Sequence, residues 1–591
     1  MTDTDTTHTR KQAKPERRPV TPYFDLKKDP SGRRYMEVKL RGIALLRLVL
    51  SNKGTAFTQE ERISLELDGL LPPQVETLSD QIARVYEGFR TAPSDLAKYQ
   101  FLREIQERQE ILFYALLEQH LEEMLPIVYT PTVGKAVQQF SHIYQTPRGL
   151  SFSPINIHRA ERTVQSYPMD DVRMIVVTDS SAILGIGDQG YGGLAIPIGK
   201  LALYTVAGGV SPFHTMPVAL DVGTDRIDLI NDPRYLGVRQ RRLRGADYDD
   251  FVDRFVTAIK HRWPKAVIQW EDLSKTAAFE VLERYRDVTP SFNDDIQGTG
   301  AVALAGVLQA CELEGESIAD HTFVIHGAGA GGAGAADAIV DGLMGAGLSK
   351  EDAHAKVFVL DSRGLLIEGR SVEAYKQPFV QPKTRVADWK TESGTPDLLE
   401  TVIHSGATVL LGLSGQPGAF DEPVVRACAA NCERPIVFPL SNPTTSSEAH
   451  PAEVLAWTDG KARVATGSPF GDVRYEGKTQ IVGQGNNAFI FPGLGMGAIL
   501  ADAKKVTDGM VRAAAYALAA YTKERYTTER RIYPPVSDLQ ETSRRVAAAV
   551  ILAAIEDGVA QKANLPSTPE AVRAYVEERF WKPEYLPFVG G

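Results

Sequence analysis

The sequence has few cysteines and no long apolar run, and both shortages narrow what the protein can be. Only three cysteines occur in 591 residues, too few for the disulfide framework of a secreted domain. The longest fully apolar run near the C-terminal end, 546–555, is about half of the roughly 20 residues that a membrane span needs. The first 22 residues are polar and include acids, unlike a signal or transit peptide. We therefore expect a soluble, cytoplasmic protein with a disordered tail over residues 1–22 and no membrane partner.

The sequence also lacks an excess of positive charge. Its 65 Lys and Arg residues stand against 75 Asp and Glu residues, which gives a net charge of -10 and a pI near 5.7. Nucleic acids attract positively charged surfaces, so no nucleic-acid partner is expected. We interpret the one basic run, "RQRRLRG" (239–245), as a solvated loop or a subunit contact. The length exceeds what one hydrophobic core supports and suits a multidomain enzyme.

Hydrophobic periodicity predicts an α/β protein with several parts. Helical spacing from 95 to 128 predicts a helical N-terminal layer. From 172 onward short β-rich runs alternate with helical stretches, which predicts two parallel α/β units in series, the second of Rossmann type. The expected boundaries are 23–146 for the helical N-terminal region, 147–293 for a substrate and metal α/β domain completed by about 487–550, 294–486 for a dinucleotide-binding domain, and 551–591 for a C-terminal helical tail.

Pairs of acidic residues stand at the ends of two predicted strands. Glu271 and Asp272 end "KAVIQWED", and Asp294 and Asp295 lie in "SFNDDIQGTG" between apolar residues. Ligands of parallel sheets bind at the carboxyl ends of the strands, so these groups are expected to lie close together. A buried carboxylate is costly unless it is paired or binds a metal. Three carboxylates predict a Mg²⁺ or Mn²⁺ site, whereas an isolated Asp pair would more simply cap a helix.

The glycine pattern GxGxxG occurs twice, as "GIGDQG" (185–190) and "GAGAGG" (327–332). The second directly follows the apolar strand "TFVIH", opens an Ala-rich helix and precedes a strand that ends in Asp361. This context predicts a dinucleotide site in which Asp361 binds the ribose hydroxyls. The backbone is expected to approach the pyrophosphate at Gly327, Gly329 and Gly332. The first match lacks this context, and we interpret it as an active-site loop.

Several stretches, taken together, resemble the malic enzyme family. They are "YTPTVG" (129–134), "ILGIGDQG" (183–190), "IPIGKLALYT" (196–205), "WED" (270–272), "FNDDIQGT" (292–299), "GAGAGGAG" (327–334), "LSNPT" (440–444), "ATGSPFG" (465–471) and "GQGNNAFIFPG" (483–493). The resemblance runs in order from about residue 23 to the end. It implies oxidative decarboxylation of L-malate to pyruvate and CO₂ with reduction of NAD, through bound oxaloacetate and enolpyruvate. It also implies a homotetramer or homodimer.

The resemblance further implies roles for single residues. Glu271, Asp272 and Asp295 are similar to the metal ligands of the family, and Asp294 is similar to the acid beside the catalytic lysine. Lys200 is similar to the general base that takes the C2 hydroxyl proton while hydride leaves for the nicotinamide. A lysine can act so only when burial or a nearby cation lowers its pKa.

Three more positions match the family. Tyr129 is similar to the general acid that protonates C3 of enolpyruvate. Asn442 and Asn487 are similar to the asparagines that bind the substrate carboxylate, and Asn442 also borders the cofactor. Each residue has an ordinary alternative: a partly buried tyrosine, or asparagines in turns.

Two features depart from the family pattern or leave a choice open. Malic enzymes usually carry an arginine just before "ILGIGDQG", but this sequence has Ala182 at that position. Malolactic enzymes also have a small residue there. The alternatives are therefore a malolactic enzyme that converts malate to lactate and CO₂ and retains NAD, or a catalytically silent dinucleotide sensor. Asp361 favours NAD, whereas "DSRG" (361–364) and Lys376 resemble relatives that use NADP.

Overall fold

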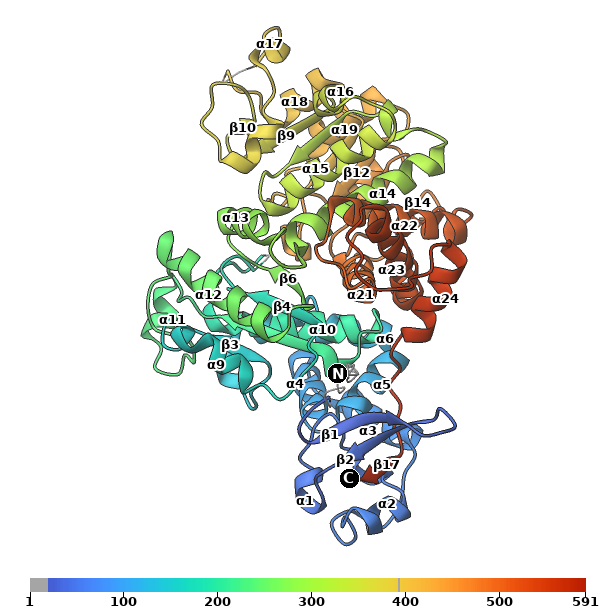
Figure 1. Ribbon diagram of the computed structural model, residues 1–591. Coiled ribbons are helices and arrows are strands. Elements are labelled where there is room, and N and C mark those ends of the chain that lie inside the picture. Colours follow the sequence, from blue (N-terminus) through green and yellow to red (C-terminus); the bar gives the residue numbers. More distant parts are fainter. Residues whose placement is uncertain (1–19, 184, 392–393) are drawn as a thin grey trace, which may run out of the picture.

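The computed structural model describes residues 20–183, 185–391 and 394–591 (Figure 1). Most of the predicted disordered tail, residues 1–19, lies outside this part of the chain. Its last residues are ordered, which corrects the predicted boundary at 22. Val20 is buried, and its backbone N–H donates to Asp25 Oδ1 at 3.3 Å.

The N-terminal region is mostly helical, as predicted, but it begins with strands. β1 (Phe24–Lys28) and β2 (Arg34–Val38) form an antiparallel hairpin. The helices are α1 (Gly42–Leu45), α2 (Gln59–Ser64), α3 (Leu78–Thr91), α4 (Asp95–Gln106), α5 (Glu110–Gln119), α6 (Leu121–Val128), α7 (Thr132–Gln138) and α8 (Phe140–Ile143). Capping boxes at Thr58 and Thr77 begin α2 and α3.

The first α/β unit is built on a five-stranded parallel sheet of order β3-β5-β4-β6-β7. Its elements are β3 (Leu150–Phe152), α9 (Ala160–Gln165), β4 (Met174–Thr178), α10 (Ala195–Val206), β5 (Thr215–Leu220), α11 (Ile227–Asn231), α12 (Ala246–Arg262), β6 (Val267–Glu271), α13 (Lys275–Tyr285) and β7 (Ser291–Asn293). Every residue of β4 is buried because helices cover both faces. Met174 and Val176 join the core under α10, and Ile175 and Val177 join the core under α12.

The second unit, at the top of Figure 1, is a seven-stranded sheet of order β10-β9-β8-β11-β12-β13-β16. Its elements are α14 (Thr299–Glu314), β8 (Phe323–His326), α15 (Ala330–Gly345), α16 (Lys350–Ala355), β9 (Val357–Asp361), β10 (Gly364–Leu365), α17 (Lys383–Val386), α18 (Leu398–Ser405), β11 (Val409–Gly412), α19 (Glu422–Asn431), β12 (Ile436–Pro439), α20 (Pro451–Trp457), β13 (Arg463–Thr466), the hairpin β14 (Val473–Tyr475) and β15 (Lys478–Gln480), and β16 (Gly483–Gln484). All pairs are parallel except that of the edge strand β10. The chain reverses direction across the sheet between β8 and β11, where ligands of doubly wound sheets bind.

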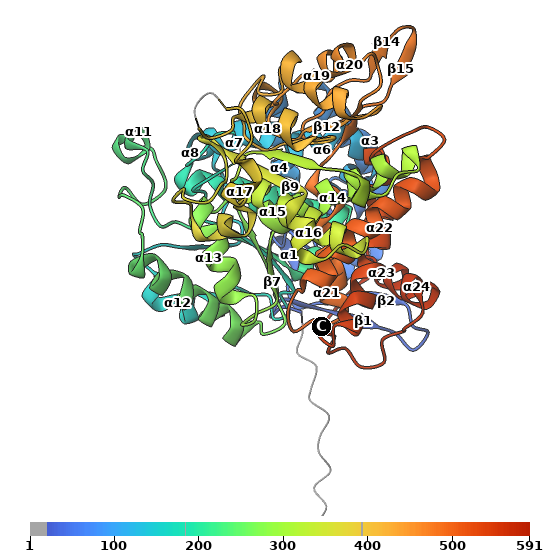
Figure 2. The same cartoon turned by 90° about the horizontal axis from the view of Figure 1, so that it is seen from above.

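Four C-terminal helices link the two units: α21 (Phe491–Leu500), α22 (Asp508–Tyr526), α23 (Leu539–Glu556) and α24 (Pro569–Arg579). A Cβ at Gly493, Gly495 or Gly497 of α21 would lie within 2.6 Å of Val546, Tyr204 or Val550, so the glycines allow α21 to pack closely between α10 and α23. Figure 2 shows α22 to α24 on one side of the molecule and α11 and α12 on the other.

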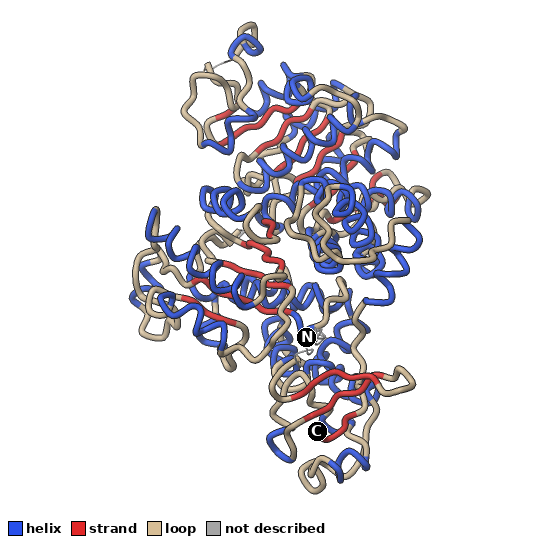
Figure 3. The backbone as a smooth tube through the Cα atoms, in the orientation of Figure 1, coloured by secondary structure: helices blue, strands red, loops and turns tan. Residues whose placement is uncertain are grey.

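The predicted helical tail after residue 551 is wrong at its end. The last element is a strand, β17 (Phe588–Gly590), which pairs in parallel with β2 (Figure 3). A strand of three residues shows no periodicity, so sequence patterns did not reveal it. One helical stretch, 294–314, is long and apolar enough to cross a membrane, but it is largely buried and packs against α15 and α22. The predicted fold class, an α/β protein with a helical N-terminal layer, a parallel α/β domain and a Rossmann-type domain, is confirmed.

Candidate active site and metal centre

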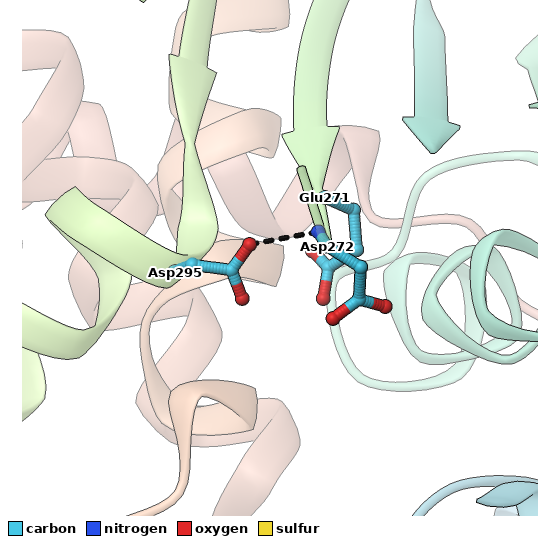
Figure 4. A group of neighbouring side chains, drawn as sticks. All are labelled: Glu271, Asp272 and Asp295. Carbon is cyan, nitrogen blue, oxygen red and sulfur yellow. Dashed lines mark hydrogen bonds between the residues drawn. The ribbon is translucent and has the colours of Figure 1, made fainter. Parts of the chain in front are cut away.

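Three predicted acids meet at the carboxyl ends of β6 and β7. One oxygen of each of Glu271, Asp272 and Asp295 lies within 4.8 Å of those of the other two (Figure 4). Neighbours in an extended strand face opposite ways, but Asp272 has a φ of +55°, which turns the chain out of β6. Its backbone N–H donates to Asp295 Oδ2 at 2.7 Å. Glu271 and Asp272, which are neighbours at the end of β6, can thus face the same point as Asp295.

The electrostatics of this cluster fit a divalent cation. Burial, reinforced by the neighbouring carboxylates, raises the pKa of Asp272 well above its usual range, and burial likewise raises the pKa of Glu271 and of Asp295. Asp272 Oδ2 is buried without a hydrogen-bond donor among the described residues. Buried oxygen ligands with excess negative charge suit a hard cation such as Mg²⁺ or Mn²⁺.

Lys200, on α10, lies at the centre of the site and is 2% exposed. Its Nζ is 2.5 Å from Asp294 Oδ2 and 3.0 Å from Glu271 Oε1. Burial lowers the pKa of Lys200, but Asp294 and Glu271 outweigh it, so the pKa stands well above its usual range. This direction is opposite to the lowering that we expected. Two carboxylates at contact distance dominate over desolvation.

Tyr129 lies where α6 ends, beside the lysine. Lys200 Nζ is 5.3 Å from the centre of the Tyr129 ring and 4.5 Å from that of Phe491. A Cβ at Gly199 would be 2.7 Å from Val128 O, so this glycine lets α10 approach the end of α6. Burial, above all, raises the pKa of the Tyr129 phenol.

Of the two predicted asparagines, Asn487 contacts Asp294, whereas Asn442 contacts the first glycine loop. Asn487 Nδ2 donates to Asp294 Oδ2 at 3.1 Å and to Thr299 Oγ1 at 3.2 Å. Asn442 follows β12, and its Oδ1 accepts from Ser468 Oγ at 2.5 Å. A Cβ at Gly185 would be 3.0 Å from Asn442 O, so the first glycine loop packs against this residue.

The second glycine loop joins β8 to α15, as predicted, and adjoins the acids. Gly327 has a φ of +115°, and a Cβ at Gly332 would lie 1.6 Å from Gly327 O. Gly329 precedes the first residue of α15. A Cβ at Gly334 would be 2.1 Å from Ile296 O, so the start of α15 rests on the turn that carries Asp294 and Asp295. The second glycine loop and the turn that carries Asp295 therefore lie side by side.

Asp361 ends β9 among basic groups. Arg370 Nη2 is 2.5 Å from Asp361 Oδ1, and Lys376 Nζ is 3.8 Å from Oδ2. Burial raises the pKa of Asp361, but the hydrogen bond from Arg370 and the other cations outweigh it and hold the pKa below its usual value. The negative charge of Asp361, the acid expected to bind ribose, is thus partly neutralised by Arg370 and Lys376.

The basic run 239–245 proved only partly solvated. Arg239, Arg241 and Arg244 are exposed, but the Arg242 side chain is 7% exposed. It pairs with Asp188 of the first glycine loop and donates to Asp179 O at 2.9 Å. Sequence reasoning missed this contact because nothing in the run distinguishes one arginine from the others.

Ala182 occupies the position at which malic enzymes usually carry an arginine. Its backbone N–H donates to Asp272 O at 3.0 Å, so Ala182 lies beside the acid cluster.

Comparison with known proteins agrees with this arrangement. Residues 106–286 match the family model "Malic enzyme, N-terminal domain", and residues 296–555 match "Malic enzyme, NAD binding domain". Proteins named NAD-dependent malic enzyme from Pseudomonas syringae pathovar tomato and Acinetobacter baylyi are each 45% identical, over 94% and 92% of this chain and 98% and 96% of their own.

Solved structures agree as well. The malic enzyme of Entamoeba histolytica is 25% identical with a TM-score of 0.54 and covers 87% of this chain and 90% of its own. That of Pyrococcus horikoshii is 27% identical with a TM-score of 0.52 and covers 78% and 89%. The chain belongs to the malic enzyme family.

Proposed function

We propose that this protein catalyses the oxidative decarboxylation of L-malate to pyruvate and CO₂, with NAD as the hydride acceptor. The observation that carries the proposal is the convergence of Glu271, Asp272 and Asp295 around a point beside Lys200 and the second glycine loop. Relatives named NAD-dependent malic enzyme support the reaction and the cofactor. The protein is thus an NAD-dependent oxidoreductase.

Glu271, Asp272 and Asp295 would hold Mg²⁺ or Mn²⁺ through their carboxylate oxygens, because the first two acids are buried and the third is partly buried. When bound, the cation supplies Lewis acidity toward the C2 oxygen and the adjacent carboxylate, and bound NAD accepts hydride from C2. Glu271 is shared between this site and Lys200, so occupancy of the site opposes the rise in the pKa of the lysine.

The protein's own residues handle the protons. In this proposal the pKa of Lys200 is lowered when a cation is bound beside Glu271, so that its Nζ can take the proton of the C2 hydroxyl as hydride leaves, and Asp294 orients the amine at 2.5 Å. After loss of CO₂, the Tyr129 hydroxyl gives its proton to C3 of enolpyruvate. The raised pKa of this phenol keeps it protonated for that step. Asn442 and Asn487 bind the substrate carboxylate in this proposal, and Asn487 also orients Asp294.

The choice of dinucleotide follows from Asp361. Its carboxylate can accept hydrogen bonds from both ribose hydroxyls and repels a 2′-phosphate, so we propose NAD as the preferred cofactor. Arg370 and Lys376 offset part of that repulsion, which makes NADP the alternative. A cytoplasmic location and a homotetramer or homodimer complete the proposal.

One assay separates the proposed reaction from its alternatives. The protein is incubated with L-malate, Mn²⁺ and NAD, and NADH, pyruvate and lactate are measured. We expect NADH and pyruvate in equal amounts. Lactate without net NADH would instead show the malolactic reaction, whose enzymes also have a small residue at the position of Ala182. No turnover would favour a catalytically silent dinucleotide sensor.

A further inference from the structure

A fully buried glutamate outside the proposed catalytic set ties together two loops of the Rossmann unit. Glu448 lies between β12 and α20 and is 0% exposed. Its Oε1 accepts from the backbone N–H and the hydroxyl of Ser414, both at 2.8 Å, and from Ser441 Oγ at 2.6 Å. Oε1 also accepts from Gly415 N at 3.2 Å, and Oε2 accepts from Ser441 N at 3.4 Å.

The bonding of this carboxyl group is unusual for a buried acid. Among the described residues, the hydrogen-bond donors to the Glu448 carboxyl group are neutral backbone N–H groups and serine hydroxyls, which offset its desolvation. A second link, from Gly415 N to Ser441 Oγ at 2.9 Å, joins the two loops directly. A carboxylate accepts such bonds at both oxygens, and charge-assisted bonds are stronger than neutral ones. The group therefore fixes the separation of the loop after β11 from the loop after β12.

Both of these loops contact a glycine loop of the proposed cofactor site. The loop after β11 lies against the second glycine loop, because a Cβ at Gly327 would be 2.4 Å from Leu413 O and 2.7 Å from Ser414 N. The loop after β12 continues from Ser441 into Asn442. Asn442 O in turn lies against Gly185 of the first glycine loop.

We propose that Glu448 is a positioning residue for the dinucleotide. By holding Ser414 and Ser441 at a fixed separation, it sets the distance between the glycine loop at the pyrophosphate and Asn442 at the reacting end of the cofactor. This inference rests on the proposed function for the identity of the cofactor. The hydrogen bonds of the Glu448 side chain involve neither the proposed metal ligands nor Lys200, so we expect its main effect on NAD.

The test compares Glu448→Gln with the unaltered protein. Glutamine keeps the volume but turns one acceptor into a donor that faces Ser441 N and removes the charge. We expect about tenfold weaker NAD binding by titration calorimetry and a similar rise in KM for NAD. The kcat of Mn²⁺-dependent oxaloacetate decarboxylation, measured without NAD at saturating oxaloacetate, should change less than about twofold, because Lys200 and the acid cluster are untouched. Glu453→Gln, at an exposed position on α20, is the matched control and should bind NAD as the unaltered protein does.

A second variant reaches the same group from another side. A Cβ at Gly412 would lie 2.6 Å from the Glu448 carboxyl carbon and from Oε2, so Gly412→Ala displaces the carboxyl group without altering its donors. It should also weaken NAD binding. Unchanged NAD affinity in both variants overturns the inference. An equal loss of oxaloacetate decarboxylation and of malate oxidation, with NAD affinity unchanged, also overturns it. If the unaltered protein binds NAD but does not oxidise malate, the proposed function fails while the binding comparison still tests Glu448.

Discussion

Two adjacent aspartates have different partners in this site. Asp294 contacts Lys200 and Asn487, whereas Asp295 accepts the backbone N–H of Asp272 and faces the other two acids. The π-helical turn 294–298 separates the two carboxylates, so one can orient the base while the other faces the cation site. Neither aspartate caps this turn. The N-cap is the preceding residue, Asn293, whose Oδ1 accepts from Ile296 N at 3.0 Å.

Replacing the lysine should separate the two halves of the reaction. We predict that Lys200→Ala abolishes malate oxidation, because no base then takes the C2 hydroxyl proton, while part of the oxaloacetate decarboxylation survives. Both rates are measured on the same preparation, with Lys200→Met as a variant that fills the volume. Equal loss of both activities would remove Lys200 from the role of base.

For single residues, the sequence predicted which side chains form the candidate site better than it predicted the partners of those side chains. Strand-end acids could be predicted because parallel strands bring their carboxyl ends together. The direction of the Lys200 pKa could not, because it depends on the distance to Glu271 and Asp294, which are far away in sequence. The burial of Arg242 depends likewise on Asp188, 54 residues earlier.

Among the elements, α15 has the strictest requirements. Its first turn must approach both the loop at Gly327 and the turn at Ile296, and a side chain at Gly332 or Gly334 would overlap their carbonyl oxygens. The glycine pattern predicted the first contact because dinucleotide loops require it. The contact with the turn 294–298 joins elements of different units, and periodicity within one helix does not reveal it.

A methyl group at the tightest of these positions should damage the cofactor site. We predict that Gly332→Ala weakens NAD binding by at least about tenfold, because its Cβ would lie 1.6 Å from Gly327 O and force the loop open. Binding is measured by calorimetry. The matched control is Gly134→Ala on α7, where a Cβ would meet nothing within 4 Å. Equal NAD affinity in both variants would contradict the close approach at Gly332.

Across the whole molecule, the C-terminal segment runs back to the N-terminal hairpin (Figure 1). Phe588 packs on Phe57 with ring centres 5.4 Å apart, and its N–H donates to Glu61, 527 residues away. Lys53 pairs with the same Glu61 and lies 4.4 Å from the Phe588 ring centre. Pairing over such a separation leaves no local signal, so the sequence predicted a helical tail instead.

Removing this anchor should loosen the N-terminal sheet. We predict that Phe588→Ala, at a residue 8% exposed, destabilises the docked strand by roughly 3 kcal/mol and speeds hydrogen exchange of the β1 and β2 amides. Val589→Ala, at a 48% exposed position of the same strand, is the control and should change exchange little. Identical exchange in the two variants would show that β17 does not hold the sheet.

We propose that Glu271, Asp272 and Asp295 bind one divalent cation and that malate oxidation depends on it. The most direct measurement is a Mn²⁺ titration of the metal-free protein, with bound metal and NADH formation from malate followed together. We predict one tight Mn²⁺ per chain, with activity rising in proportion to occupancy, and loss of both in Asp272→Asn but not in the exposed-site variant Asp247→Asn. Malate oxidation without bound metal, or unchanged Mn²⁺ binding in Asp272→Asn, would contradict the account.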